Sequence, residues 1–230
     1  MAWSSLSFYC DQTMERKRTP YEIIYYSVYL VFEGLSFRAC SRAIRPLVNR
    51  THKAVWDWYQ EIGQDKSFHK LFRLGRERVR IFAVDETGIT IAGMQAFLFI
   101  AYEPFQDRIL GLHLIWNPNS LSAGLFLKDL VRKYGRHPVW TDGAEYYSLA
   151  CESLNLKHHV YLHGSWLWEV TERAVQRLKD RTESFDDLFP CRSHGERCKL
   201  NHIQNWINVF WLHHQPMYKS FIRAIEYVLK

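Results

Sequence analysis

The sequence predicts an α/β fold in which a small all-helical domain precedes a mixed five-stranded sheet with flanking helices. Three observations support this prediction. Apolar residues recur at helical spacing within residues 20–62. Three consecutive segments rich in apolar and β-branched residues follow within residues 80–115, and helical and strand-like segments alternate after them. This order of elements is typical of a sheet with helices packed on it.

The all-helical region follows a polar lead-in of residues 1–19. The apolar run Tyr21–Phe32 predicts a buried helix. A second helix is expected from Ser36 to about Pro46. Thr51 is a suitable N-cap for a third helix, because its hydroxyl can accept a hydrogen bond from the first turn.

The sheet region contains five expected strands, at Arg80–Ile91, Met94–Tyr102, Arg108–Ile115, Pro138–Thr141 and His158–Leu162. Helices are expected between and after them, at Ser120–Lys133, Ala144–Leu154 and Trp166–Phe185. Two further helices are expected to close the chain, at residues 199–214 and 217–229.

A basic segment, residues 63–79, lies between the two regions and predicts a linker. We therefore expect five parts, which are a flexible lead-in (1–19), an all-helical domain (20–62), the basic linker (63–79), a sheet domain (80–198) and C-terminal helices (199–230).

The composition excludes several classes of protein. Hydrophobic residues make up 47% of the chain, so it is neither disordered nor fibrous. No apolar run is long enough to span a membrane, and the first residues do not have the pattern of a signal peptide. Five widely spaced cysteines do not form a disulfide framework, which favours a cytoplasmic protein with reduced thiols. The net charge of +6 favours a polyanionic partner such as nucleic acid.

The region from Gly34 to Trp56 contains no acidic residue. Its basic residues are Arg38, Arg42, Arg45, Arg50 and Lys53. Two helices with a short break and clustered basic residues are typical of a helix-turn-helix, whose second helix enters the major groove of DNA. A small helical bundle with a solvated basic surface is the alternative interpretation.

Two carboxylates occupy unusual places in the predicted sheet. Asp85 lies within an apolar strand (VDETG), where a charge is costly to bury without a partner. Asp142 ends another strand and is followed by Gly143 (VWTDG). Strand ends are where α/β sheets carry their sites, and carboxylates on neighbouring strands are suitable ligands for Mg²⁺. Turn or capping roles for both residues are the alternative.

The chain resembles the DDE transposases of bacterial and archaeal insertion sequences. The resemblance rests on the helix pair, VDETG on the first of three strands, WTDGAEYY after the fourth, and an acidic residue on a helix with a basic tail. It covers about residues 20–215, and TERAVQRLKDRTESFDDLFPC (Thr171–Cys191) is its most specific segment. It implies an RNase H-like catalytic domain.

The resemblance also implies a third carboxylate. Family members tend to carry Glu-Arg at this position, with a basic residue seven positions later that contacts the DNA end. Glu172, which is followed by Arg173 and by Lys179 at that offset, fits this pattern. Glu169 is the second candidate, but Gln176 follows it at the same offset.

The activity implied by the resemblance is metal-dependent cleavage and strand transfer of DNA. Asp85, Asp142 and Glu172 would bind two Mg²⁺ ions, with Mn²⁺ as a substitute. Arg173, Arg177 and Lys179 would hold phosphates. The implied partners are the two element ends, the target DNA and further copies of the chain, and the implied location is the cytoplasm in association with the nucleoid.

One feature departs from the family. Only 29 residues separate Asp142 from Glu172, which is fewer than is usual. A degenerate transposase that binds DNA without cutting it is therefore the alternative hypothesis. A cellular RNase H-like nuclease is a third, and the predicted helix-turn-helix argues against it.

Overall fold

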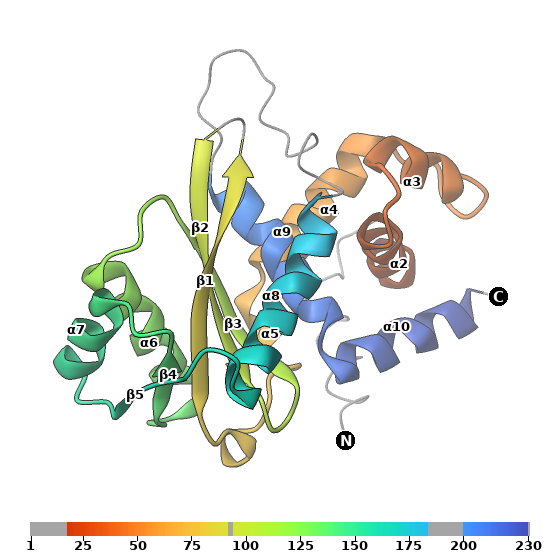
Figure 1. Cartoon of the computed structure of the whole chain (residues 1–230). Helices are drawn as coiled ribbons and strands as arrows, with labels where there is room; N and C mark the ends of the chain where they lie inside the picture. Colours follow the sequence, from red (N-terminus) through yellow and green to blue (C-terminus); the bar gives the residue numbers. More distant parts are fainter. Residues whose placement is uncertain (1–17, 92–93, 184–199, 230) are drawn as a thin grey trace. The chain divides into compact units, whose positions relative to one another are not determined.

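The computed structural model of the chain describes residues 18–91, 94–183 and 200–229 (Figure 1). The chain divides into two compact units. The helical unit consists of the residues up to Arg73 together with those from Asn205 onward, and the sheet unit runs from Leu74 to Gln204. Within the described ranges, no helix has both the length and the apolar composition that crossing a membrane requires.

The helical unit contains α2 (Tyr21–Phe32), α3 (Phe37–Ala43), α4 (His52–Gln64), α5 (Lys66–Lys70) and α10 (Pro216–Val228). Helix α9 (Leu200–His213) contains the residue at which the two units divide.

Side-chain caps and buried rings explain the local structure of this unit. Thr51 Oγ1 accepts a hydrogen bond from the backbone N of Ala54 at 3.3 Å, so the predicted N-cap of α4 is confirmed. The ring of Tyr25 on α2 stacks on Phe68 of α5 at 5.0 Å and meets Phe221 of α10 edge-on at 5.1 Å. This aromatic cluster joins the beginning and the end of the chain in one core.

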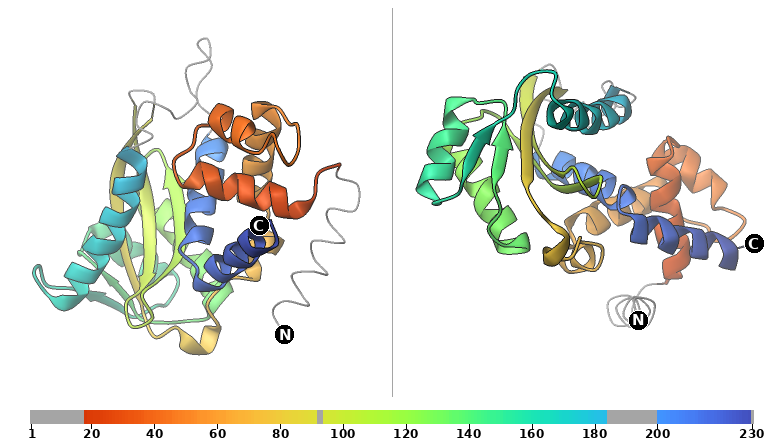
Figure 2. Two further views of the ribbon diagram at one scale, coloured as in Figure 1. Left: turned by 90° about the vertical axis from the view of Figure 1, so that its right-hand side faces the viewer. Right: turned by 60° about the horizontal axis from the view of Figure 1, so that its bottom comes forward.

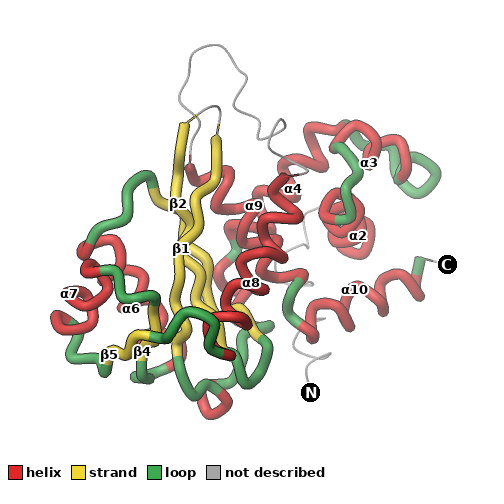
Figure 3. The backbone as a smooth tube through the Cα atoms, in the orientation of Figure 1, coloured by secondary structure: helices red, strands yellow, loops and turns green. Residues whose placement is uncertain are grey.

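The sheet unit is built on five strands, β1 (Phe82–Ile91), β2 (Met94–Glu103), β3 (Arg108–Ile115), β4 (Val139–Thr141) and β5 (His158–Val160). Their order in the sheet is β3-β2-β1-β4-β5. Figure 3 draws the strands in yellow and the helices in red. The first three strands are antiparallel neighbours, whereas β4 is parallel to β1 and β5 is parallel to β4. This is the RNase H-like arrangement, so the predicted fold class is confirmed.

The helices of the sheet unit are α6 (Ser120–Tyr134), α7 (Glu145–Ser153) and α8 (Trp166–Glu183). Helices α6 and α7 cover one face of the sheet and α8 covers the other (Figure 2). Phe82 and Val84 of β1 belong to the core beneath α6 and α7. Successive side chains of a strand point to opposite faces, so Asp85 lies on the face that α8 covers.

The main difference from the sequence-based expectation lies in the predicted basic linker. It contains α5 and a short 3₁₀ helix, Arg76–Arg78. Asp65 caps α5 by accepting hydrogen bonds from the backbone N of Ser67 and of Phe68, both at 3.0 Å. Phe68 then anchors the helix in the core. The five-part division of the chain stays a prediction, and nearly all of its lead-in lies outside the described residues.

Candidate active site

Asp85 lies near the middle of β1, the central strand of the sheet. Its side chain is half-buried, and Oδ1 accepts a hydrogen bond from the backbone N of Glu86 at 2.9 Å. Burial, followed by the charges of Glu86, Asp142 and Glu172, raises the pKa of Asp85 to about 7. The structure therefore places three other carboxylates close enough to Asp85 to oppose its ionisation.

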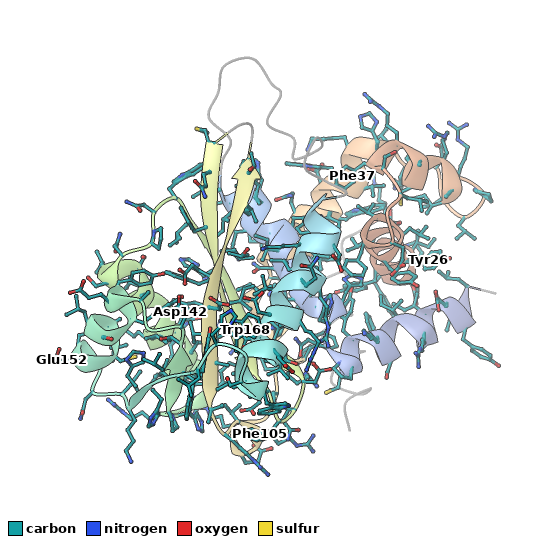
Figure 4. All side chains as sticks on the ribbon, viewed as in Figure 1. Tyr26, Phe37, Phe105, Asp142, Glu152 and Trp168 are labelled. Carbon is teal, nitrogen blue, oxygen red and sulfur yellow. The ribbon has the colours of Figure 1, made fainter. Side chains whose placement is uncertain are left out.

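Asp142 reaches this region because β4 runs parallel to β1. Ala83 of β1 pairs with Trp140 of β4, so β4 ends beside the stretch that carries Asp85. Figure 4 labels Asp142 in the turn that follows β4. Its side chain is exposed, and Oδ1 accepts a hydrogen bond from the backbone N of Ala144 at 3.1 Å.

Hydrogen bonds from a buried threonine stabilise the turn that carries Asp142. Thr141 Oγ1 accepts a hydrogen bond from the backbone N of Gly143 at 3.1 Å and lies 2.8 Å from His158 Nε2. Gly143 has φ +98°, and a Cβ there would lie 3.0 Å from Val160 Cγ1. A side chain at this position is therefore disfavoured both by the backbone conformation and by the neighbouring strand.

Glu172 is exposed on α8, whose other side packs on the sheet through Val170, Ala174, Val175 and Leu178. Its charge is one of those that raise the pKa of Asp85. Glu169, one turn earlier, is not among the largest of these contributions. The short spacing between Asp142 and Glu172 thus leaves Glu172 within electrostatic reach of Asp85.

Tyr161 belongs to the same region, and the sequence-based reasoning missed it. Its backbone N donates a hydrogen bond to the carbonyl O of Thr141 at 3.0 Å, which fixes it beside the end of β4. The residue is only 6% exposed, and its Oη has no hydrogen-bond partner within the described part of the chain. Burial and the charges of Asp85, Asp142 and Glu172 raise the pKa of Tyr161 well above its usual 10. A tyrosine that follows a strand is common in cores, so the sequence held no signal for it.

Glu86, the residue after Asp85, has different surroundings. It lies on the opposite face of β1, where its Oε2 accepts a hydrogen bond from the Tyr147 hydroxyl at 2.6 Å. Tyr147 is a fully buried residue of α7. Glu86 therefore serves the packing of α7 on the sheet.

The fit of a divalent cation to this region depends on side-chain positions. In the described parts of the chain, no three His, Cys, Asp or Glu side chains are grouped so that they could hold a metal ion. However, Asp142 and Glu172 are exposed, so both can change rotamer, Asp142 with loss of the hydrogen bond that its Oδ1 accepts from the backbone N of Ala144. The oxygen donors match the preference of Mg²⁺ and Mn²⁺, and the charges of the same carboxylates act on the buried Tyr161 hydroxyl, which has no hydrogen-bond partner among the described residues. The residues present therefore fit a hard divalent cation.

The predicted DNA-binding residues of α8 differ in their surroundings. Arg173 and Arg177 are exposed. Arg177 Nη1 pairs with Asp107 Oδ1 at 2.9 Å, and Asp107 also accepts a hydrogen bond from the Tyr102 hydroxyl. Lys179 is half-buried. Arg177 thus joins α8 to the turn between β2 and β3.

The predicted DNA-binding residues of the helical unit fall into two groups. Arg38, Arg42 and Arg45 are exposed on and just after α3. Arg50, in contrast, donates hydrogen bonds from Nε to Thr19 Oγ1 and from Nη2 to the carbonyl O of Arg18, both at 2.7 Å. Lys53 pairs with Asp57 on the same helix.

The connection between α3 and α4 runs from residue 44 to residue 51. This is longer than the turn of about three to four residues in a helix-turn-helix. The exposed residues of α4 include Asp57 and Glu61 as well as Lys53. The basic surface therefore lies mainly along α3, and the helix-turn-helix stays a prediction.

The chain matches no protein-family model and no curated protein sequence. Solved structures with some similarity include the catalytic core domain of BIV integrase, with 15% identity, a TM-score of 0.43, and coverage of 66% of this chain and 99% of that one. The HTLV-2 integrase catalytic core domain in complex with magnesium has 14% identity and a TM-score of 0.42, over 58% of this chain and 84% of that one.

A chain of the simian T-cell lymphotropic virus intasome, in complex with the PP2A regulatory subunit B56 gamma, has 16% identity and a TM-score of 0.45. The match covers 80% of this chain and 68% of that one. The order and directions of the strands define the RNase H-like fold.

Proposed function

We propose that this chain is a DDE transposase of a prokaryotic insertion sequence, a polynucleotidyl transferase that cuts and joins DNA. One observation carries the proposal. Asp85 on the central strand, Asp142 after β4 and Glu172 on α8 come from three separate elements of an RNase H-like sheet, and both of the others oppose the ionisation of Asp85. A carboxylate whose pKa is strongly raised by burial and by neighbouring carboxylates is typical of functional sites.

Asp85, Asp142 and Glu172 would hold two divalent cations. When bound, such cations activate the attacking water or DNA 3′-hydroxyl and stabilise charge on the leaving 3′ oxygen. Asp85 fixes the centre to the rigid middle of the sheet, whereas the exposed Asp142 and Glu172 approach the DNA from the solvent side. Arg173 and Lys179 on α8 would neutralise phosphates on either side of the reacting one. No covalent bond to the protein forms.

The helical unit would hold the ends of the element. The exposed Arg38, Arg42 and Arg45 favour contacts to phosphates and guanine edges, in the manner of the predicted helix-turn-helix. Arg50, Lys53 and Arg177 would contribute less, because each already has a protein partner. Two element ends must be held together, so we propose that the chain acts as a homo-oligomer in the cytoplasm, at the nucleoid.

A catalytically inactive relative that only binds DNA is the second candidate. The short spacing between Asp142 and Glu172 favours it, as does the absence of a ready-made three-ligand group in the described residues. In this case the basic surface along α3 would act alone, for example as a repressor of transposition.

The test is a cleavage and strand-transfer assay with the full chain, Mg²⁺ or Mn²⁺, and labelled DNA that carries the ends of the source element. The proposal expects cation-dependent cutting by the wild type and a loss of at least about 1,000-fold in Asp85→Asn. A gel-shift assay on the same DNA serves as the control for binding. DNA that is bound but left uncut by both proteins would favour the second candidate, and DNA that is neither bound nor cut would contradict both.

A further inference from the structure

Tyr161 lies where the two short parallel strands of the sheet end. Its backbone N–H donates to the carbonyl O of Thr141, the residue before Asp142, at 3.0 Å. The backbone of Tyr161 is thereby tied to the same turn that places Asp142. The residue is only 6% exposed, so the surrounding fold limits where its hydroxyl can lie.

The hydroxyl of Tyr161 is a buried donor without an acceptor in the described part of the chain. A buried hydroxyl that lacks a partner destabilises a fold, so an acceptor that comes within reach of it would be stabilising. The negative charges that act on it come from Asp85, Asp142, Glu172 and Glu86, and Asp85 has the largest effect. The ordinary pKa of a tyrosine, about 10, already keeps the phenol protonated at physiological pH, so it remains a donor.

Asp85 is the acceptor that best suits this donor. Among the described residues, the only hydrogen bond to the Asp85 side chain is accepted by Oδ1 from the backbone N of Glu86. Oδ2 can therefore bind a cation or accept a hydrogen bond from a hydroxyl. A carboxylate that binds a cation is commonly oriented by a hydrogen bond from a neighbouring residue, which decides which lone pair faces the ion.

We propose that Tyr161 is a positioning residue that donates its hydroxyl hydrogen to Asp85 when Asp85, Asp142 and Glu172 converge on a divalent cation. This inference rests on the carboxylate centre of the proposed function. It adds a residue that touches neither DNA nor cation and acts through Asp85. When the three carboxylates converge on the cation, the buried hydroxyl gains an acceptor. The resulting hydrogen bond favours the cation-bound arrangement.

Tyr218 provides a matched control. It is also a fully buried tyrosine whose Oη lacks a hydrogen-bond partner in the described ranges. It lies on α10 in the helical unit, and burial alone raises its pKa. Tyr161→Phe and Tyr218→Phe therefore remove the same atom from the same kind of buried site, with carboxylates nearby in only one case.

The experiment is a calorimetric titration of the full chain with Mn²⁺ and with Mg²⁺, together with thermal unfolding in the absence of cation. Both variants should unfold at or above the temperature of the wild type, because each loses an unpaired buried hydroxyl. Tyr161→Phe should bind the cation about ten- to hundredfold more weakly than the wild type. Tyr218→Phe should bind it with unchanged affinity.

Equal cation affinity in Tyr161→Phe and the wild type would overturn the inference, as would a wild type that binds no divalent cation. The cleavage assay separates this failure from a failure of the proposed function. If the wild type cuts DNA while the two proteins bind cation equally, only the role of Tyr161 is wrong. If cation binding depends on Tyr161 but no DNA is cut, the proposed function is wrong and the positioning role stands.

Discussion

Neighbouring carboxylates on the two faces of the sheet have opposite surroundings. Beneath α7, Glu86 accepts a hydrogen bond from the buried hydroxyl of Tyr147, which stabilises the packing of that helix. On the face that α8 covers, Asp85 has a backbone donor and is opposed by Asp142 and Glu172. A paired carboxylate contributes to the fold, whereas a carboxylate gathered with others of its own charge does not. The second arrangement therefore calls for a role outside stability.

The largest expected effect on stability comes from removing the carboxylate of Glu86. Glu86→Ala removes the acceptor of the buried Tyr147 hydroxyl and should lower the free energy of unfolding by about 1–3 kcal/mol. Glu86→Gln, which keeps an acceptor, should lower it by less. Chemical denaturation of both variants measures the difference. If the two variants were equally stable, Glu86 would not stabilise the packing of α7 through this hydrogen bond.

An effect of comparable size but opposite sign is expected on the other face. The pKa of Asp85 is raised from 3.8 to about 7 in the folded protein, so the folded state holds a proton that the unfolded state has lost between these pH values. Without cation, stability should therefore fall as the pH rises from about 4 to about 7.

Asp85→Asn removes this titration. At pH 8 without cation it should be more stable than the wild type by about 2 kcal/mol, after allowance for solvent screening of a half-buried group. At pH 3 the two proteins should unfold alike. Added Mn²⁺ should stabilise the wild type and not the variant. Lower stability of the variant at pH 8 would show that Asp85 is a structural carboxylate like Glu86.

The smallest effects separate the two kinds of arginine in the helical unit. Arg50→Ala loses hydrogen bonds to Thr19 and to the carbonyl O of Arg18, so the free energy of unfolding should fall by about 1 kcal/mol. Arg42→Ala should leave stability unchanged but weaken DNA binding and reduce its salt dependence by about one phosphate contact. Gel-shift titrations at several salt concentrations measure this slope. If the salt dependence of DNA binding were identical for Arg42→Ala and the wild type, α3 would not be part of the DNA-binding surface.

Much of the fold follows from local sequence patterns. The long apolar runs of α2, β2 and β3 set those elements to within a residue or so of their observed bounds. Helix α5 was missed because five residues with a strong positive charge show little periodicity, and only tertiary packing of Phe68 makes them a helix. The grouping of the C-terminal helices with the N-terminal ones depends on contacts such as Tyr25 to Phe221, which no local pattern contains.

The residues of the candidate site likewise include some that a sequence pattern marked and others that it did not. A charge inside an apolar strand marked Asp85, and a carboxylate before a glycine at a strand end marked Asp142. Glu172 could be chosen over Glu169 only by resemblance, because both are exposed residues of one helix. Tyr161 had no signal in the sequence, since its significance depends on which carboxylates surround it in three dimensions.

The central claim is that Asp85, Asp142 and Glu172 form one cation-dependent centre. The most direct measurement compares Glu172→Gln with its neighbour Glu169→Gln, both in the full chain, for Mn²⁺-dependent cutting of element-end DNA. The account predicts that Glu172→Gln binds the DNA but loses at least about 1,000-fold in cutting, while Glu169→Gln cuts within a few-fold of the wild type. Loss of cutting in Glu169→Gln with Glu172→Gln active would contradict it.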